Sequence, residues 1–324
     1  MTETIITAVS TPSPVPTRPA APRKRRRRRG TLAPYLLSAP AIVLYIAFTV
    51  VPVFYTLGIS FFAERLTGGG ILGIRATTFV WLENYVDVLT DSQLIAGLGR
   101  MAIYGIIAVP IMLGLALLFA LLLDHPGVRL QRFGRTAIFV PYAVPGVVAA
   151  LMWGFMYLPS TSPFSYITEQ LGLGAIPFLE PQGIYGALAN ISIWGGVGFN
   201  MLVIYTALRS IPSELIEAAR LDGAGEVQIA LRVKVPLVRP ALVLTAIFAL
   251  LGALQLYGEP LVLKPLTDTI TSTWAPLMSI YQDAFALDNL PVAAAASVVL
   301  AVGTAAVSVA VLLLVRWSTR RGMR

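Results

Sequence analysis

Six long apolar stretches constrain the fold of this chain more than any other feature. A helix needs about 20 predominantly apolar residues to cross the hydrocarbon core of a bilayer. The stretches that reach this length lie at roughly 34–62, 95–123, 134–158, 185–208, 241–261 and 292–316. They are too long for barrel strands and lack alternating polarity. The sequence therefore predicts an all-α, polytopic membrane protein with six transmembrane helices.

The composition supports residence in a membrane. Of 324 residues, 56% are hydrophobic and only 12% are charged, about half the charge of a soluble domain. The chain has no cysteine, which excludes disulfides and thiolate metal sites. The single histidine, His125, lies in "LLLDHPGVRL". It is interpreted as an interfacial loop residue rather than a metal ligand or catalytic group.

The first 31 residues differ from the rest. "TPSPVPTRPAAP" is rich in proline, serine and threonine and predicts disorder. "RKRRRRRG" follows it, and the next apolar run is long enough to span, so it indicates an uncleaved first helix. Beside a membrane span, a basic cluster typically anchors topology and contacts lipid headgroups rather than nucleic acid. We therefore expect a disordered, basic cytoplasmic tail over 1–31 and a membrane domain over 32–324.

The distribution of basic residues predicts the topology. If the N-terminus is cytoplasmic, 20 of the 24 lysines and arginines fall in cytoplasmic segments. This bias predicts that both termini lie in the cytoplasm. The protein is then expected to be a multi-pass protein of the inner, or plasma, membrane. The bias also accounts for the net charge of +8 without a nucleic-acid partner. Residues 209–240 then form a cytoplasmic loop between the fourth and fifth spans.

That loop predicts a helical elbow. In "RSIPSELIEAARLDGAG", Ser213 can cap a short helix and Gly223 stands where it would end. Helical spacing puts four residues on one face: Leu215, Ala218, Ala219 and Asp222. A second helix, "EVQIALRVKV", should end near Pro236, because the residue before a proline disfavours helical geometry. On spacing alone, an amphipathic connector resting on lipid headgroups remains the alternative.

The same segment carries a family motif. Glu217-Ala218-Ala219, then Asp222-Gly223-Ala224, then Pro236 and Pro240 resemble the EAA loop of permease subunits of binding-protein-dependent ABC importers. Ala230 stands where many members of that family have phenylalanine.

Other segments resemble the maltose- and glycerol-phosphate-type sugar permeases. They are "WLENYVDVL", "IFVPYAVPGVVAALMWGFMY" and "SIYQDAFALDNLPVAAAASVVL", and the resemblance covers most of 34–316. The Gly-Gly-Pro stretch usual after the fifth span is replaced by "LVLKPLTDTITSTWAP".

The resemblance implies both a role and partners. The elbow would dock into a cleft on an ATP-binding cassette ATPase dimer, with Glu217 paired to a basic group there and Gly223 providing the bend. The implied coupling residues are Glu217, Ala218, Ala219, Asp222, Gly223 and Pro236. The further partners implied are a second permease subunit in a heterodimer, an extracytoplasmic solute-binding protein, a sugar substrate and membrane lipid.

The chain lacks enzyme motifs. A Walker A loop needs a lysine directly after a glycine, and none of Lys24, Lys234 and Lys264 follows one. Gly-x-Ser-x-Gly is absent as well. We expect this transport subunit to bind no cofactor, with ATP used by the partner ATPase.

Polar and aromatic residues within the spans predict a substrate path, because such residues are often functional there. The candidates are Trp153, Trp194, Asn200, Tyr205, Gln255 and Tyr257. Gly195, Gly196 and Gly198 indicate either close helix packing, which is favoured, or a bend. No span has a charge at its middle, which argues against a proton- or sodium-driven carrier.

Three other readings remain open. The importer could carry another solute, such as glycerol phosphate or a polyamine. The chain could be a self-contained channel or secondary transporter, which would work without an ATPase. It could also be a membrane scaffold that transports nothing.

Overall fold

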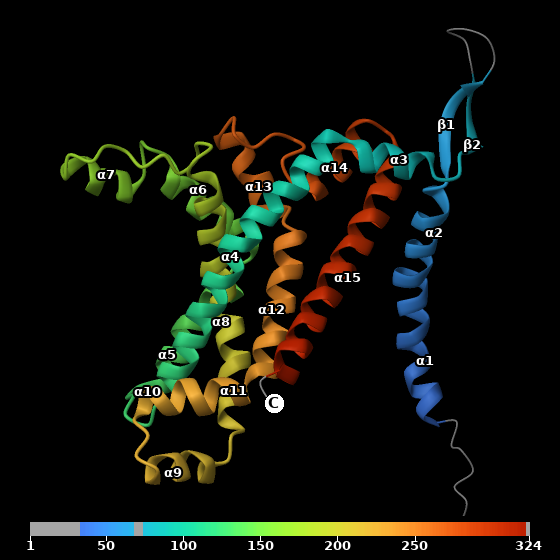
Figure 1. Ribbon diagram of the computed structural model, residues 1–324. Helices are drawn as coiled ribbons and strands as arrows, with labels where there is room; N and C mark the ends of the chain where they lie inside the picture. Colours follow the sequence, from blue (N-terminus) through green and yellow to red (C-terminus); the bar gives the residue numbers. More distant parts are fainter. Residues whose placement is uncertain (1–32, 68–73, 322–324) are drawn as a thin grey trace, which may run out of the picture. The chain divides into compact units, whose positions relative to one another are not determined.

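A computed structural model describes residues 33–67 and 74–321, and most of this chain is helical (Figure 1). The predicted disordered tail over 1–31 lies outside the described residues. The chain divides into two compact units, residues 1–51 and 52–324.

In the first unit, α1 (Ala33–Tyr45) continues into the π-turn η1 (Ile46–Val50). The chain then enters α2 (Val51–Ile59), and the run Tyr35–Ile59 is long and apolar enough to cross a membrane. Neither η1 nor α2 has a buried residue. An apolar helix without a buried face needs lipid or another protein against it.

A β-hairpin follows, which the all-α prediction did not anticipate. Strands β1 (Phe62–Thr67) and β2 (Ile74–Phe79) pair antiparallel, with Phe62 opposite Phe79. The aromatic and β-branched residues at these positions favour strand geometry. The next helix, α3 (Glu83–Thr90), is tied to the hairpin by buried Asn84, whose Nδ2 donates to the carbonyl oxygens of Ser60 (2.8 Å) and Phe62 (2.7 Å).

Four further long helices form the body of the second unit. They are α4 (Ser92–Asp124), α8 (Ile184–Arg209), α12 (Arg239–Leu254) and α15 (Leu290–Arg321). Helices α4 and α8 pack along much of their length (Figure 1). The buried residues Ala108, Met112, Ala116 and Ala120 lie four apart on α4. The three alanines among them have small side chains, which let two helix backbones approach closely.

The third predicted span, 134–158, is broken rather than continuous. It consists of α5 (Gln131–Phe139), the 3₁₀ turn η2 (Val140–Ala143) and α6 (Gly146–Tyr157), with a bend of 93°. Val144 is extended, as expected for a residue before a proline, here Pro145. Within the described residues, five helices are therefore long and apolar enough to span, or six if this bent pair counts as one span.

The short elements lie at the two ends of the long helices. At one end are α7 (Pro163–Gln170), α13 (Gly258–Leu263) with the turn η4 (Lys264–Leu266), and α14 (Pro276–Tyr281) with the π-turn η5 (Gln282–Ala286). At the other end are α5, α9 (Ser213–Leu221), α10 (Glu226–Ile229), the π-turn η3 (Ala230–Lys234) and α11 (Val235–Leu237). Two of the basic segments grouped by the topology prediction, 129–135 and 209–239, thus lie at the same end of these helices.

Candidate functional site

The loop over 209–240 has the predicted helix–glycine–helix form. Helix α9 ends in a pair of backbone hydrogen bonds, from Ala224 N–H to Ala219 O and from Gly223 N–H to Arg220 O, both 3.0 Å. Gly223 has φ +84°, a left-handed conformation that closes helices in this way and favours glycine. Helix α10 begins directly after Gly225. We call residues 209–238 the elbow.

Of two local predictions for the elbow, one is wrong and the other holds for a different reason. Ser213 is the first residue of α9 and does not cap it; the cap position is Pro212. The second helix ends near Pro236, as predicted, since α11 ends at Leu237. The stated reason is wrong, because Val235 before the proline is helical; the π-turn η3 ends at Lys234, two residues before the proline. The break comes at Val238, with ψ 8°.

The elbow carries exposed apolar side chains. Leu221 at the end of α9 is 89% exposed, and Val227 and Leu231 on the following helical segment are also mostly exposed. Leu215 is exposed as well. Apolar side chains gathered on a polar loop mark a protein or membrane contact surface.

Ion pairs hold the elbow against the long helices. Lys234 Nζ lies 2.6 Å from Oδ2 of Asp124, the last residue of α4, and both side chains are less than 10% exposed. Arg209, at the end of α8, lies 3.9 Å from the same carboxylate. Within the elbow, Arg220 pairs with Glu226 at 2.9 Å. Asp124 was not among the predicted site residues, although its position directly after a long apolar run could have marked it.

The predicted coupling residues lie on and beside the surface of the elbow. Glu217, Ala218 and Asp222 are exposed, whereas Ala219 and Pro236 are half-buried. Glu217 lines a cleft of about 280 Å³ together with Asp124, Arg209, Arg220 and Lys234. Among the described residues, Glu217 forms no ion pair, so its carboxylate is available to a partner.

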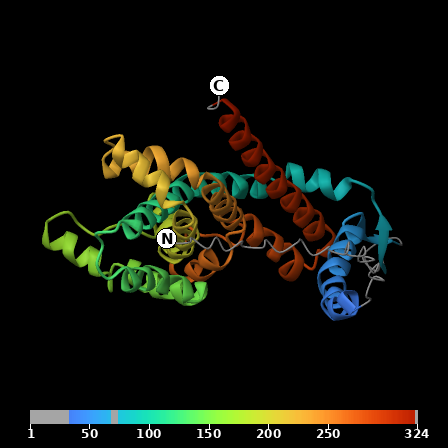
Figure 2. The same cartoon turned by 90° about the horizontal axis from the view of Figure 1, so that it is seen from below.

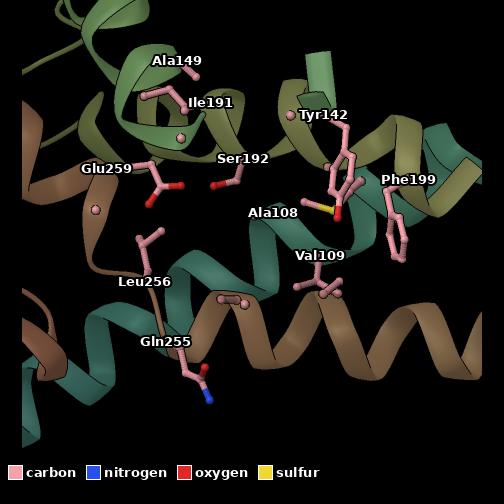
Figure 3. Close-up of a pocket in the computed structure, with 18 of the residues that line it drawn as sticks. Ala108, Val109, Tyr142, Ala149, Ile191, Ser192, Phe199, Gln255, Leu256 and Glu259 are labelled. Atoms are coloured by element: carbon pink, nitrogen blue, oxygen red, sulfur yellow. The ribbon is translucent and has the colours of Figure 1, made fainter. Parts of the chain in front are cut away.

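A larger cavity of about 470 Å³ lies among the membrane helices. Residues of α4, α8, α12, α13 and the broken third span surround it (Figure 3). Its polar lining consists of Tyr104, Tyr142, Ser192, Asn200, Gln255, Tyr257 and Glu259. We call this space the central cavity.

Two helix breaks create the central cavity. The bend at Val144–Pro145 contributes Tyr142 and Gly146 to its wall, and the non-helical junction between α12 and α13 contributes Gln255 and Tyr257. Irregular backbone within a membrane protein is tolerated where it lines a cavity or is buried in protein. The sequence shows the prolines at the first break, but it does not show which way the bend turns.

Three of the six predicted path residues line the central cavity: Asn200, Gln255 and Tyr257. Trp153 lies instead in an aromatic cluster, with ring centroids 5.8 Å from Tyr157 and 6.0 Å from Trp194. Tyr205 is buried, with the Arg135 guanidinium 5.0 Å from its ring centroid. The lining also includes Tyr104, Tyr142, Ser192, Phe199 and Glu259, none of which is among the six predicted path residues.

Asn200 leaves an acceptor without a partner in the described chain. The residue is 4% exposed, and its Nδ2 donates to Gly196 O at 2.8 Å and to Met112 Sδ at 3.3 Å. Its Oδ1 is buried without a hydrogen bond. A nearby pair is satisfied, since Tyr104 Oη donates to Ser192 Oγ at 2.5 Å. A buried acceptor without a partner is costly.

The three glycines of α8 have different roles. A Cβ added to Gly198 would lie 2.3 Å from Ile138 O, so glycine there permits close contact with α5. A Cβ on Gly196 would meet Met112 at 2.9 Å, whereas one on Gly195 would meet nothing within 4 Å. The favoured packing interpretation is therefore correct for Gly198, while Gly195 leaves the cavity wall open.

Glu259 is the one charged residue that lines the central cavity in the described chain. Its carboxylate points toward Ser192 across the cavity (Figure 3). A Cβ on Gly146, the first residue of α6, would lie 3.8 Å from its Oε1. A helix N-terminus favours a negative charge beside it. The described residues contain no group of three or more histidines, cysteines or acids that could hold a metal ion.

The chain is similar to known transport proteins. The sequence profile of a family described as "Binding-protein-dependent transport system inner membrane component" matches residues 113–322. The sn-glycerol-3-phosphate transport system permease protein UgpA of Brucella suis is 30% identical over 273 residues, 83% of this chain and 89% of that protein. The probable ABC transporter permease protein YurN of Bacillus subtilis is 27% identical over 285 residues, 86% and 94% of the two chains.

A solved structure shares the fold. It is a bacterial ABC transporter involved in the import of the acidic polysaccharide alginate, matched with a TM-score of 0.71 at 20% identity. The match covers 89% of this chain and 95% of the other.

Proposed function

This chain belongs to the family of inner membrane components of binding-protein-dependent transport systems, and we propose that it forms half of the translocation path of an ABC importer for a sugar or oligosaccharide. Membership of the family makes the chain a multi-pass transport subunit, with ATP hydrolysed on a separate subunit. The proposal concerns its cargo, its site residues and its partners.

The central cavity carries the proposal for the cargo. Its volume of about 470 Å³ lies within the range of about 300–1,000 Å³ typical of small-molecule sites. The rings of Tyr142 and Phe199 stack in its wall with centroids 5.1 Å apart. An aromatic surface beside hydroxyl, amide and carboxylate groups suits the C–H faces and hydroxyls of a sugar ring. Asn200, Gln255 and Tyr257 are the predicted path residues that support this role.

The elbow is proposed to receive the motion of the ATPase. The coupling residues would be Glu217, Ala218, Ala219, Asp222, Gly223 and Pro236. The exposed apolar side chains of the elbow and the free carboxylate of Glu217 support a docked partner. The buried pair of Lys234 and Asp124 supports transmission, because it joins the elbow to the end of α4.

The proposed assembly follows from the predicted topology. Both termini and the elbow would face the cytoplasm, where an ATPase dimer would bind ATP; this chain would bind no cofactor. A second permease subunit would complete a heterodimer, and an extracytoplasmic solute-binding protein would deliver the sugar. Membrane lipid would cover the apolar surface of the Tyr35–Ile59 helix.

Reconstitution tests the proposal. The chain, its second permease subunit and its ATPase would be placed in proteoliposomes with a solute-binding protein loaded with its own sugar. We expect uptake only when ATP is present on the side of the membrane that carries the ATPase, and only when the loaded binding protein is present on the other side. Uptake driven by a solute, proton or sodium gradient without nucleotide would instead identify a self-contained secondary transporter.

Site-specific crosslinking tests the proposed docking. Because the chain has no cysteine, single cysteines can be placed through 215–225 without removing native thiols. We expect these positions to crosslink to the ATPase, while Glu169→Cys on exposed α7, at the opposite end of the helices, does not. Crosslinks from the elbow to lipid alone would identify it as a headgroup-bound connector.

A phosphorylated solute is the second candidate cargo. The name of the Brucella suis relative favours it. Uptake of sn-glycerol-3-phosphate by the same proteoliposomes distinguishes this cargo from a neutral sugar.

A further inference from the structure

We propose that Glu259 makes the central cavity reject anionic solutes, so that the cargo is an uncharged, hydroxyl-rich molecule rather than a phosphate ester or a uronate. The consequence for the cargo rests on the proposed function. The charge selectivity of the cavity is a property of this chain and is testable without transport.

The first argument is the charge of the lining. Glu259 contributes a carboxylate, and no lysine, arginine or histidine of the described chain lines the cavity. Arg100 is directed elsewhere, since its Nε donates to Trp274 O at 2.6 Å and its guanidinium also donates to Thr273 O. An anion in this space would therefore meet a like charge in surroundings that screen poorly.

The second argument is that the carboxylate is already supported by the protein. It lies beside the N-terminus of α6, near Gly146. The partial positive charge of that helix end complements it. The cavity therefore does not require a cationic occupant to balance the carboxylate, which favours an uncharged solute over a polyamine.

The third argument is the need for hydrogen-bond donors. The Glu259 carboxylate, which lines the cavity, can only accept hydrogen bonds. Hydroxyl groups of a polyol can donate to it. A phosphate or carboxylate group on the solute brings acceptors and a negative charge, which the carboxylate cannot satisfy.

Charged thiol reagents test the inference. Ser192→Cys puts a thiol opposite Glu259 (Figure 3), and Gly195→Cys puts one in open space on the same wall. The full-length chain in detergent would be treated with methanethiosulfonate reagents of similar size carrying a sulfonate, a hydroxyl or a trimethylammonium group. Rates would be normalised to Ser210→Cys, an exposed position at the end of α8.

We expect the sulfonate reagent to react at least about tenfold more slowly, relative to the hydroxyl reagent, inside the cavity than at the control position. Glu259→Gln should remove this difference. Glu259→Asp should preserve it, which separates the effect of charge from the effect of changing the side chain. Two cavity cysteines keep the test valid if one variant folds poorly.

Three results would overturn the inference. One is a sulfonate-to-hydroxyl rate ratio equal to that at Ser210→Cys. Another is a slow sulfonate reaction that persists in Glu259→Gln. The third is no reaction of either cavity cysteine with the hydroxyl reagent, because the cavity would then admit no solute-sized molecule. Failure of ATP-driven uptake alone would overturn the proposed function and leave this charge selectivity standing.

Discussion

Lys234 Nζ lies 2.6 Å from Asp124 Oδ2, and both side chains are almost completely buried. The two residues are 110 positions apart in the chain, one in the π-turn η3 and the other at the end of α4. The elbow is therefore joined to a membrane-spanning helix by a buried ion pair. Such a pair is sensitive to the loss of one partner, because the remaining charge stays buried.

Removing one member of this pair should destabilise the chain strongly. We expect Lys234→Met or Asp124→Leu to cost about 3–5 kcal/mol, because each leaves an uncompensated buried charge. The thermal unfolding midpoint in detergent measures the effect. The double variant should recover much of the stability but lose ATP-driven uptake. Arg209→Met is the control, since Arg209 is exposed and lies 3.9 Å from Asp124, and it should change stability by less than about 1 kcal/mol.

The glycines of the elbow provide a matched pair of substitutions. Gly223 has φ +84°, whereas Gly225 has φ −74°, and an added Cβ meets nothing within 4 Å at either position. Gly223→Ala should therefore cost about 1–2 kcal/mol through backbone strain alone, while Gly225→Ala should cost less. Unfolding midpoints and uptake rates measure both. Equal effects of the two substitutions would contradict the role assigned to the left-handed turn.

Reversing the charge of Glu217 should uncouple transport. We expect Glu217→Lys to abolish ATP-driven uptake while the protein still reaches the membrane, because its carboxylate is proposed to meet a basic group of the ATPase. Loss of a charged pair at such an interface costs about 2–5 kcal/mol. Glu214→Lys, an exposed change in the first turn of the same helix, is the control. Wild-type uptake by Glu217→Lys would exclude this docking role.

Helix α8 offers a second matched pair. Gly198→Ala would bring a Cβ to 2.3 Å from Ile138 O and 2.7 Å from Phe139 Cα. Because backbone cannot move aside as a flexible side chain can, we expect a loss of about 3 kcal/mol or more. Gly195→Ala, with open space around its Cβ, should leave the unfolding midpoint nearly unchanged. A similar midpoint for the two variants would mean that α5 does not pack against α8 in this way.

The acid Asp283 should make stability depend on pH. Burial, and then the charge of Asp91, raise the pKa of Asp283 above its ordinary value of 3.8. Its contribution to stability is therefore full below that ordinary value and is lost as the pH rises through the raised pKa. We expect Asp283→Asn to raise the unfolding midpoint at neutral pH, and the gain should shrink on acidification.

The influence of Asp91 on Asp283 can be measured separately. Asp91→Asn should reproduce part of the gain seen in Asp283→Asn, because it removes the neighbouring charge and asparagine still caps α4. A gain from Asp283→Asn that does not change with pH would show that ionisation is not its cause.

Sequence analysis located the long helices well because membrane spans are determined by local composition. The predicted stretch 95–123 lies inside α4 (Ser92–Asp124), and 185–208 lies inside α8 (Ile184–Arg209). Gly223 was recognisable as the end of α9, since its left-handed conformation is a local requirement. Pro236 correctly indicated where the second helix ends, but Val235 before it is helical rather than extended.

The central cavity was less accessible to sequence reasoning. The side chains of Trp153 and Trp194 combine an apolar ring with a polar N–H group. Composition alone therefore does not tell whether they face a cavity or one another. Their environment depends on the rotation of α6 and α8 and on the bend of 93° in the third span. Glu259 was not among the predicted path residues, and only the tertiary structure places it opposite Ser192.

The break at Val238 gives the elbow the shape of a crank. The arm formed by α10, η3 and α11 runs across the direction of α12 (Figure 1), and the view from below shows it leading away from the end of that helix (Figure 2). At about 1.5 Å per residue, the arm is about 18 Å long and the shaft α12 about 24 Å. A sideways displacement of the arm becomes a torque on the shaft. The far end of that shaft carries Gln255 and, just beyond it, Glu259, so turning the arm would re-orient the groups that we propose face the solute.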